Sequence, residues 1–198
     1  MLDIITAYTR ELLEDGKLPC MIGGEHLVTL GAVKAVVQKY PELHMIHFDA
    51  HADLRDDYLG ERLSHATVMR RTWDLVGDGK IFQFGIRSGE KSEFDFARAH
   101  TVMSKFNFDG LDQAVKELAG KPVYLTIDLD VLDSSVFPGT GTPEAGGVTF
   151  NELLSAMQKL CGLSIVACDV NELSPMLDAS GASTAVACKV LRELLLML

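Results

Sequence analysis

Short apolar runs alternate along the chain with longer segments in which apolar residues recur at helical spacing. This alternation is typical of βα units, which assemble into a parallel sheet with helices on its faces. The expected strands lie near residues 18–22, 43–48, 80–85, 100–103, 122–128 and 163–169. The expected helices lie near residues 2–14, 27–39, 66–75, 90–98, 109–119, 149–160 and 181–196. The sequence therefore predicts an α/β fold.

The chain length favours a single domain. Its 198 residues can build one sizeable core, since domains usually have about 100–200 residues. Glycine and proline concentrate at residues 138–147, within the βα series, which indicates a functional loop and not a hinge. We therefore expect one domain over residues 1–198. A helix comes before the first strand, so we also expect the chain to lack its natural beginning.

The charge balance excludes several classes of partner. Lys and Arg number 18 and Asp and Glu number 28, which gives a formal net charge of −10. Without a basic run, neither nucleic acid nor an anionic membrane is an expected partner, whereas a cation is. The chain has neither an apolar run of about 20 residues nor a signal-peptide pattern, so a cytoplasmic protein is expected.

The four cysteines all lie in apolar stretches, and none forms a CxxC pair. Such positions are typical of reduced thiols packed in a core. The expected core cysteines are Cys20, Cys161, Cys168 and Cys188.

A cluster of metal-ligand residue types follows the strand at 43–48. Asp49, His51 and Asp53 occupy alternate positions, and in extended backbone alternate side chains share one face. Two carboxylates on one face repel each other unless a cation neutralises them. A cation site is therefore predicted; the alternative is a solvated loop at the strand end.

Two further strands end in, or are followed by, residues that can also bind a cation. Asp128 and Asp130 end the strand at 122–128, where the alternative is a capping or turn-forming pair. His26 follows the first strand, where the alternative is a helix-start or packing histidine. Because the carboxyl ends of parallel strands meet at one edge, all six groups can converge. Such an oxygen-rich set favours manganese over zinc, and six ligands suit two ions and a hydrolytic reaction.

Two other polar residues are candidates for catalysis and binding. His65 follows an acidic stretch and could move protons near neutral pH; the alternative is an ordinary surface histidine. Glu172 follows the last strand and could pair with a cationic substrate; the alternative is a solvated loop glutamate.

These residues lie in motifs that resemble those of the ureohydrolases, the family of arginase and agmatinase. The motifs are G-G-E-H at 23–26, D-A-H-A-D at 49–53, S-H at 64–65, T-I-D-L-D-V-L-D at 126–133, P-G-T-G-T-P at 138–143 and D-V-N-E-L-S-P at 169–175. Their order and spacing match the family. The resemblance implies a three-layer α/β/α fold with a mainly parallel sheet, and hydrolysis of a guanidino compound by a manganese-bridging hydroxide.

The resemblance also assigns roles. One manganese ion would be held by His26, Asp49, Asp53 and Asp128, and the other by Asp49, His51, Asp128 and Asp130. His65 would shuttle protons, and Glu172 would bind the guanidinium group, with Thr142 and the loop 138–147 lining the same pocket. The family often has Asp at the position of Glu25, so an adjustment beside the metal ligands is expected there. The resemblance also implies a homo-oligomer. Relative to the family, this chain is expected to be short at its N-terminus.

The loop at residues 54–63 bears on the substrate. It resembles the loop of bacterial agmatinases, so agmatine is the expected substrate, with putrescine and urea as products. Asp56, Asp57 and Glu61 are candidates for binding the distal ammonium, and a solvated acidic loop is an equal alternative. The other hypotheses are a guanidinobutyrase, an arginase or a formimidoylglutamase, and a truncated metal-binding remnant without activity.

Overall fold

The computed structural model describes residues 1–198 and has one sheet of six parallel strands at its centre. The strands are β1 (Cys20–Ile22), β2 (His44–Phe48), β3 (Ile81–Ile86), β4 (Val102–Lys105), β5 (Pro122–Asp128) and β6 (Ser164–Asn171). Their order across the sheet is β1-β6-β5-β2-β3-β4. Parallel neighbours need crossover connections, which the intervening helices supply.

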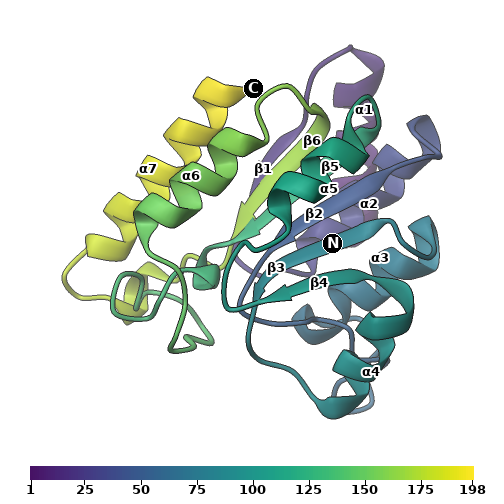
Figure 1. Ribbon diagram of the computed structural model, residues 1–198. Coiled ribbons are helices and arrows are strands. Elements are labelled where there is room, and N and C mark those ends of the chain that lie inside the picture. The colour runs from purple at the N-terminus through teal and green to yellow at the C-terminus, as the bar shows by residue number, and fades with distance from the viewer.

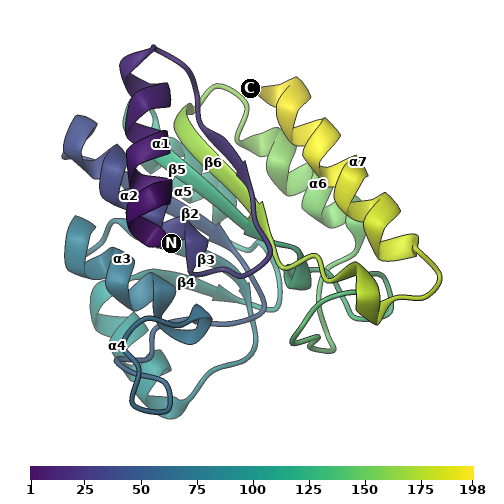
Figure 2. The same ribbon diagram turned by 180° about the vertical axis from the view of Figure 1, so that it is seen from behind.

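The helices form two layers, one on each face of the sheet (Figures 1 and 2). One face carries α1 (Leu2–Glu14), α2 (Val28–Lys39), α3 (Val68–Val76) and α4 (Lys91–His100), and the other carries α5 (Leu111–Leu118), α6 (Phe150–Lys159) and α7 (Ala182–Met197). This is the expected three-layer α/β/α arrangement. Every expected helix and strand is confirmed, with each bound within two residues of its expected position.

The central strands explain why the fold needs helices on both faces. In β5, Val123, Leu125 and Ile127 are buried against α5–α7, whereas Tyr124 is buried against α1–α4. Such double burial gives nearly continuous apolar strands. Since side chains alternate along a strand, Asp128 lies on the same face as Tyr124. The polar end of β5 therefore faces the layer formed by α1–α4.

The cysteine prediction is confirmed in part. All four thiols are free, and Cys168 is buried opposite the half-buried Cys20 on the neighbouring strand. Cys161 and Cys188 are exposed, so their placement in the core was wrong. Cys161 lies in the turn after α6, and Cys188 lies on an exposed side of α7, of which only one side is buried. No helix of the chain is long and apolar enough to cross a bilayer.

Candidate active site

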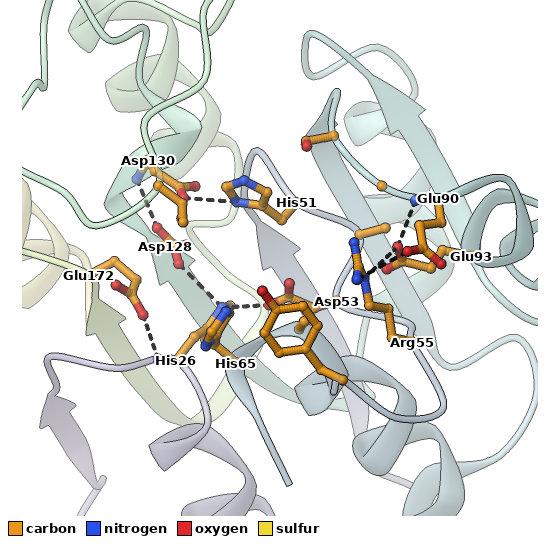
Figure 3. Close-up of a pocket in the computed structure, with 16 residues that line it drawn as sticks. His26, His51, Asp53, Arg55, His65, Glu90, Glu93, Asp128, Asp130 and Glu172 are labelled. Carbon is orange, nitrogen blue, oxygen red and sulfur yellow. Dashed lines mark hydrogen bonds and ion pairs between the residues drawn. The ribbon is translucent and has the colours of Figure 1, made fainter. Parts of the chain in front are cut away.

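A pocket of about 240 Å³ opens at the carboxyl edge of the sheet and gathers most of the predicted site residues (Figure 3). Among its lining residues are His26 from the loop after β1, His51 and Asp53 from the segment after β2, and Asp128 at the end of β5. Glu172 lies on one side of this group in the figure. The prediction that separate βα turns bring these side chains together is confirmed.

The first group of possible metal ligands centres on His26, which is buried. Its Nδ1 lies 3.1 Å from Asp49 Oδ2, 3.1 Å from Asp53 Oδ2 and 3.3 Å from Asp128 Oδ2. The other ring nitrogen, Nε2, lies 2.9 Å from Thr126 Oγ1. A partner on Nε2 fixes the orientation of the ring and leaves Nδ1 directed at the three carboxylates.

The second group centres on His51. Its Nδ1 lies 2.9 Å from Asp130 Oδ2 and 3.5 Å from Asp49 Oδ1. Asp49 therefore directs one oxygen to each group, as a bridging carboxylate does. The structure thus supports two adjacent ligand groups that share Asp49.

Two buried atoms show that a cation fits this cluster. His26 Nδ1 and Asp130 Oδ2 make no hydrogen bond of good geometry, although the first lies within 3.3 Å of three carboxylates and the second lies 2.9 Å from His51 Nδ1. Buried polar atoms are normally paired, and an unpaired one calls for a ligand such as an ion. The donor atoms are carboxylate oxygens and imidazole nitrogens without a thiolate, which suits a manganese-like ion.

The electrostatics of the cluster lead to the same conclusion. Burial raises the pKa of Asp53 to about 7, with a further contribution from the negative charge of Asp49. Burial also raises the pKa of Asp128, together with the neighbouring aspartates. For Asp49 itself, contacts with the surrounding histidines outweigh burial and lower the pKa. The negative charges of Asp53 and Asp128 are thus unfavourable in this cluster as it stands.

Two site residues adopt left-handed backbone conformations that disfavour most side chains. Asp53 has φ 54° and Glu172 has φ 68°. The Asp53 carbonyl accepts hydrogen bonds from the amides of Met69 and Arg70 in the first turn of α3. The Glu172 amide donates to the Gly24 carbonyl at 2.8 Å, and Glu172 Oε1 accepts from the His26 amide at 2.8 Å. These bonds hold both carboxylates in the pocket.

Gly23 allows the chain to enter this loop after β1. A Cβ atom at this position would lie 2.2 Å from Asn171 Oδ1, which is closer than real Cβ contacts. Any other residue would separate the His26 loop from the end of β6, so the first glycine of the G-G-E-H motif serves packing.

His65 lies at the pocket wall with about half of its side chain exposed. Ser64 caps the short 3₁₀ turn η1 (His65–Thr67) by accepting a hydrogen bond from the Ala66 amide. The His65 ring packs edge-on against Tyr58, with centroids 5.5 Å apart, and Nδ1 lies 3.5 Å from Glu25 Oε1. Glu25 Oε2 also accepts a hydrogen bond from the Leu27 amide at 3.1 Å, so this side chain contacts both the turn that carries His26 and the ring of His65.

The wall opposite Glu172 carries charges that the sequence analysis did not identify (Figure 3). Arg55 Nη1 lies 3.1 Å from Glu90 Oε1, and its Nε lies 3.5 Å from the buried Glu93 Oε2. Nothing in the sequence connects residue 55 with residues 90 and 93. The three residues Arg55, Glu90 and Glu93 are called the distal wall below.

The acidic residues proposed for the distal ammonium lie elsewhere. None of Asp56, Asp57 and Glu61 lines the pocket, and Asp56 instead binds Arg71, with Oδ1 2.7 Å from Nη2. The alternative of a solvated acidic loop is therefore confirmed for this stretch.

Arg87 holds the glycine-rich loop beside the site. From the loop 138–147 itself, Thr142 lines the pocket as predicted. The guanidinium of Arg87 donates at 2.7–3.3 Å to the backbone carbonyls of Gly85, Asp130, Val131, Leu132, Glu144 and Ala145. A Cβ atom on Gly147 would lie 2.6 Å from Arg87 Nη2, so this position requires glycine.

We expect Arg87→Lys to lower the free energy of unfolding by about 2–3 kcal/mol, because an ammonium cannot replace a planar group that bonds several carbonyls at once. Urea denaturation measures the change. The control is Arg10→Lys, since Arg10 is exposed and its guanidinium donates to Gln38. Equal stability of the two variants would contradict the role given to Arg87.

Comparison with known proteins identifies the family. The model of the arginase family matches residues 1–197. The chain belongs to the arginase family. Its relatives include the agmatinase of Bacillus subtilis, which is 46% identical over 199 residues, covering 98% of this chain and 69% of the relative. The guanidinobutyrase of Pseudomonas aeruginosa is 32% identical, covering 94% of this chain and 62% of the relative.

Solved structures agree with this assignment. A crystal structure from Clostridium difficile, assigned to the agmatinases, matches this arginase-family chain with a TM-score of 0.96 and 55% identity, covering 99% of this chain and 72% of that one. The agmatine ureohydrolase of Thermoplasma volcanium matches with a TM-score of 0.86 and 33% identity, and the match covers 98% of this chain and 66% of that one. The arginase-like fold is confirmed, and the chain is a ureohydrolase enzyme of this metal-dependent family.

Proposed function

We propose that this ureohydrolase hydrolyses agmatine to putrescine and urea with two manganese ions. The observation that carries the proposal is that one pocket is lined by members of both ligand groups and by Glu172, while the buried Asp49 joins the two groups beneath it. The agmatinases among its relatives support agmatine as the substrate. A small guanidino cation also suits a chain of net charge −10.

The residues that would hold the ions are the ones that the family motifs assign, and they include the members of both groups except His47. One ion would be held by His26, Asp49, Asp53 and Asp128, and the other by Asp49, His51, Asp128 and Asp130. When bound, a pair of divalent ions makes water nucleophilic near neutral pH. The protein contributes the position of the guanidinium carbon and the protons that the reaction requires.

Glu172 would bind the guanidinium group. One carboxylate oxygen accepts from the His26 amide, while Oε2 makes no hydrogen bond within the protein and is available to the substrate. A carboxylate is the natural partner of a planar guanidinium, because their paired atoms match. Burial raises the pKa of Glu172 to about 6, so the group is ionised at neutral pH. Thr142 lines the pocket beside it.

His65 would provide the proton for the leaving amine. Its imidazole is half-exposed at the pocket wall, so it can exchange protons with solvent. Glu25 and Tyr58 pack around the ring and limit its orientation. A histidine in this place can protonate the amine nitrogen as the bond to carbon breaks.

Removing and restoring the metal tests the proposal. We expect urea release from agmatine to cease after chelation and to return with added Mn²⁺, with two ions bound per chain. The substrate panel contains agmatine, 4-guanidinobutyrate, arginine and formimidoylglutamate, the last scored by formamide. Two bound ions without turnover on any compound would favour the inactive remnant, and equal turnover of agmatine and another guanidine would remove the preference for agmatine.

Arg55 gives a reason to consider 4-guanidinobutyrate as a second candidate substrate, since a guanidinium on the pocket wall can bind a carboxylate. In the structure Arg55 is paired with Glu90 and Glu93, so the distal wall carries one excess negative charge. This excess favours the distal ammonium of agmatine.

We therefore expect Glu90→Gln to lower the preference for agmatine over 4-guanidinobutyrate by about tenfold, because it removes the exposed negative charge and leaves Arg55 with Glu93 as its one carboxylate partner. The ratio of kcat/KM for the two substrates measures the change. Glu61→Gln is the control, since Glu61 does not line the pocket. An unchanged ratio in Glu90→Gln would exclude the distal wall from substrate selection.

A further inference from the structure

His47 is a buried histidine beside the ligand groups that has no role in the mechanism above. It lies in β2 with no exposed surface, two residues before Asp49 and on the same face of the strand. Its Nε2 lies 2.7 Å from Asp49 Oδ2, and its Nδ1 lies 3.1 Å from Gln83 Nε2. Residues 47 and 83 are direct partners in the pairing of β2 with β3.

The surroundings of Gln83 fix the direction of these hydrogen bonds. Gln83 Nε2 lies 2.8 Å from the carbonyl oxygen of Ala52, which can only accept, so this atom is the amide nitrogen. Its remaining hydrogen points to His47 Nδ1. On the other side, the hydroxyl of Thr101 donates to Gln83 Oε1 at 3.1 Å. Every polar atom of the Gln83 amide is therefore paired, and its orientation is determined.

The tautomer of His47 follows. A ring nitrogen that accepts a hydrogen bond carries no hydrogen, so a neutral imidazole must carry its proton on Nε2. Because Gln83 Nε2 donates one hydrogen to the Ala52 carbonyl and the other to Nδ1, Nδ1 carries no hydrogen and the ring is neutral. Nε2–H therefore donates to Asp49 Oδ2.

The direction of the hydrogen bond from Nε2 to Asp49 decides whether His47 can coordinate a metal ion. Its Nε2 lies among ligand atoms of His26, Asp49 and Asp53, so by position alone it could be an additional nitrogen ligand. A nitrogen that carries a hydrogen has no lone pair to offer. The same hydrogen holds Asp49 Oδ2, while the His51 amide holds Asp49 Oδ1 at 2.5 Å. Both oxygens of the shared carboxylate are thus fixed by donors from the protein.

We propose that Gln83 sets the tautomer of His47, and that His47 is a positioning donor for the shared carboxylate and not a metal ligand. The proposal rests on the metal site proposed above, but the tautomer belongs to the protein alone. It can therefore be measured whether or not the chain releases urea.

Histidine nitrogen NMR on the metal-free full-length chain tests the tautomer. We expect the His47 ring to be protonated at Nε2 and unprotonated at Nδ1 at neutral pH. In Gln83→Glu the new carboxylate can only accept, so the proton should move to Nδ1 or appear on both nitrogens. After loading with cadmium as a spin-active probe, we expect metal–nitrogen coupling for His26 and His51 and none for His47.

Three variants test the positioning role by Mn²⁺ binding, followed through the electron paramagnetic resonance of free Mn²⁺. His47→Asn removes the donor and should weaken binding by about 10–100-fold. His47→Gln places an amide nitrogen near the position of Nε2 and should recover most of that loss. His44→Asn is the control, because His44 is also buried in β2 but bonds the Glu42 carbonyl away from the pocket.

Several results would overturn the proposal. These are a wild-type ring protonated at Nδ1, cadmium coupling to His47, Mn²⁺ binding by His47→Asn as tight as wild type, or no recovery in His47→Gln. Failure of the proposed function gives a different pattern, in which the tautomer and the Mn²⁺ affinities follow expectation but no guanidine is hydrolysed.

Discussion

Asp53→Asn is expected to lower urea release from agmatine by about 10³-fold and to stabilise the metal-free protein. The loss of activity follows because a metal contributes several kcal/mol to the transition state, and about 4 kcal/mol corresponds to 10³ in rate. The backbone is not disturbed, since asparagine is among the residues that best tolerate the left-handed conformation at this position.

The gain in stability comes from the raised pKa of Asp53. The group titrates near pH 7 in the folded chain and near pH 4 when unfolded, so between these values the unfolded state is ionised and the folded state is not. The metal-free wild type should therefore lose stability as pH rises from about 4 to 7. Asparagine does not titrate, so its advantage should grow over the same interval to at most about 4 kcal/mol.

Denaturant unfolding at several pH values in the presence of chelator, together with a urea assay, measures both effects. A general defect in folding would lower activity and stability together, whereas the structure predicts opposite signs. A variant that is less stable than the wild type at pH 7 without metal would show that the carboxylates do not repel one another in the empty site.

Glu172→Gln is expected to lower kcat/KM for agmatine by about 10²–10³-fold, because the substrate guanidinium loses a charged partner in a partly buried site. Glutamine keeps an oxygen that can accept the hydrogen bond from the His26 amide. Mn²⁺ affinity should therefore stay close to that of the wild type.

This combination separates substrate binding from metal binding. Steady-state kinetics and Mn²⁺ titration of the same preparation measure the two effects. Glu61→Gln is the matched control, since it also removes one negative charge but does not line the pocket. If Glu172→Gln kept its activity, or lost Mn²⁺ in proportion to activity, Glu172 would not be the guanidinium anchor.

The sequence alone predicted the fold and the convergence of the ligand residues. Alternate positions in a strand share a face, and parallel strands end at one edge, so Asp49, His51 and Asp53 could be placed with Asp128 without coordinates. The motifs of the family then assigned the roles. Both arguments depend on residues that are close together in the chain.

The features that sequence reasoning missed depend on contacts between distant segments. His47 becomes notable only when the pairing of β2 with β3 brings Gln83 beside it. The distal wall requires the first turn of α4 to lie against the loop after β2. Spacing within one segment carries no information about such pairs.

The hydrogen bonds between the Glu172 strand end and the His26 loop have a consequence for how this enzyme can change its substrate. Glu172, which would bind the reacting end of a guanidine, also supports the peptide of His26, which would bind a metal, so a change in the backbone of one disturbs the other. Arg55 and Glu90 are free of that linkage. New specificities in this lineage should therefore arise by exchanging side chains at the far end of the pocket, while the reacting end stays constant.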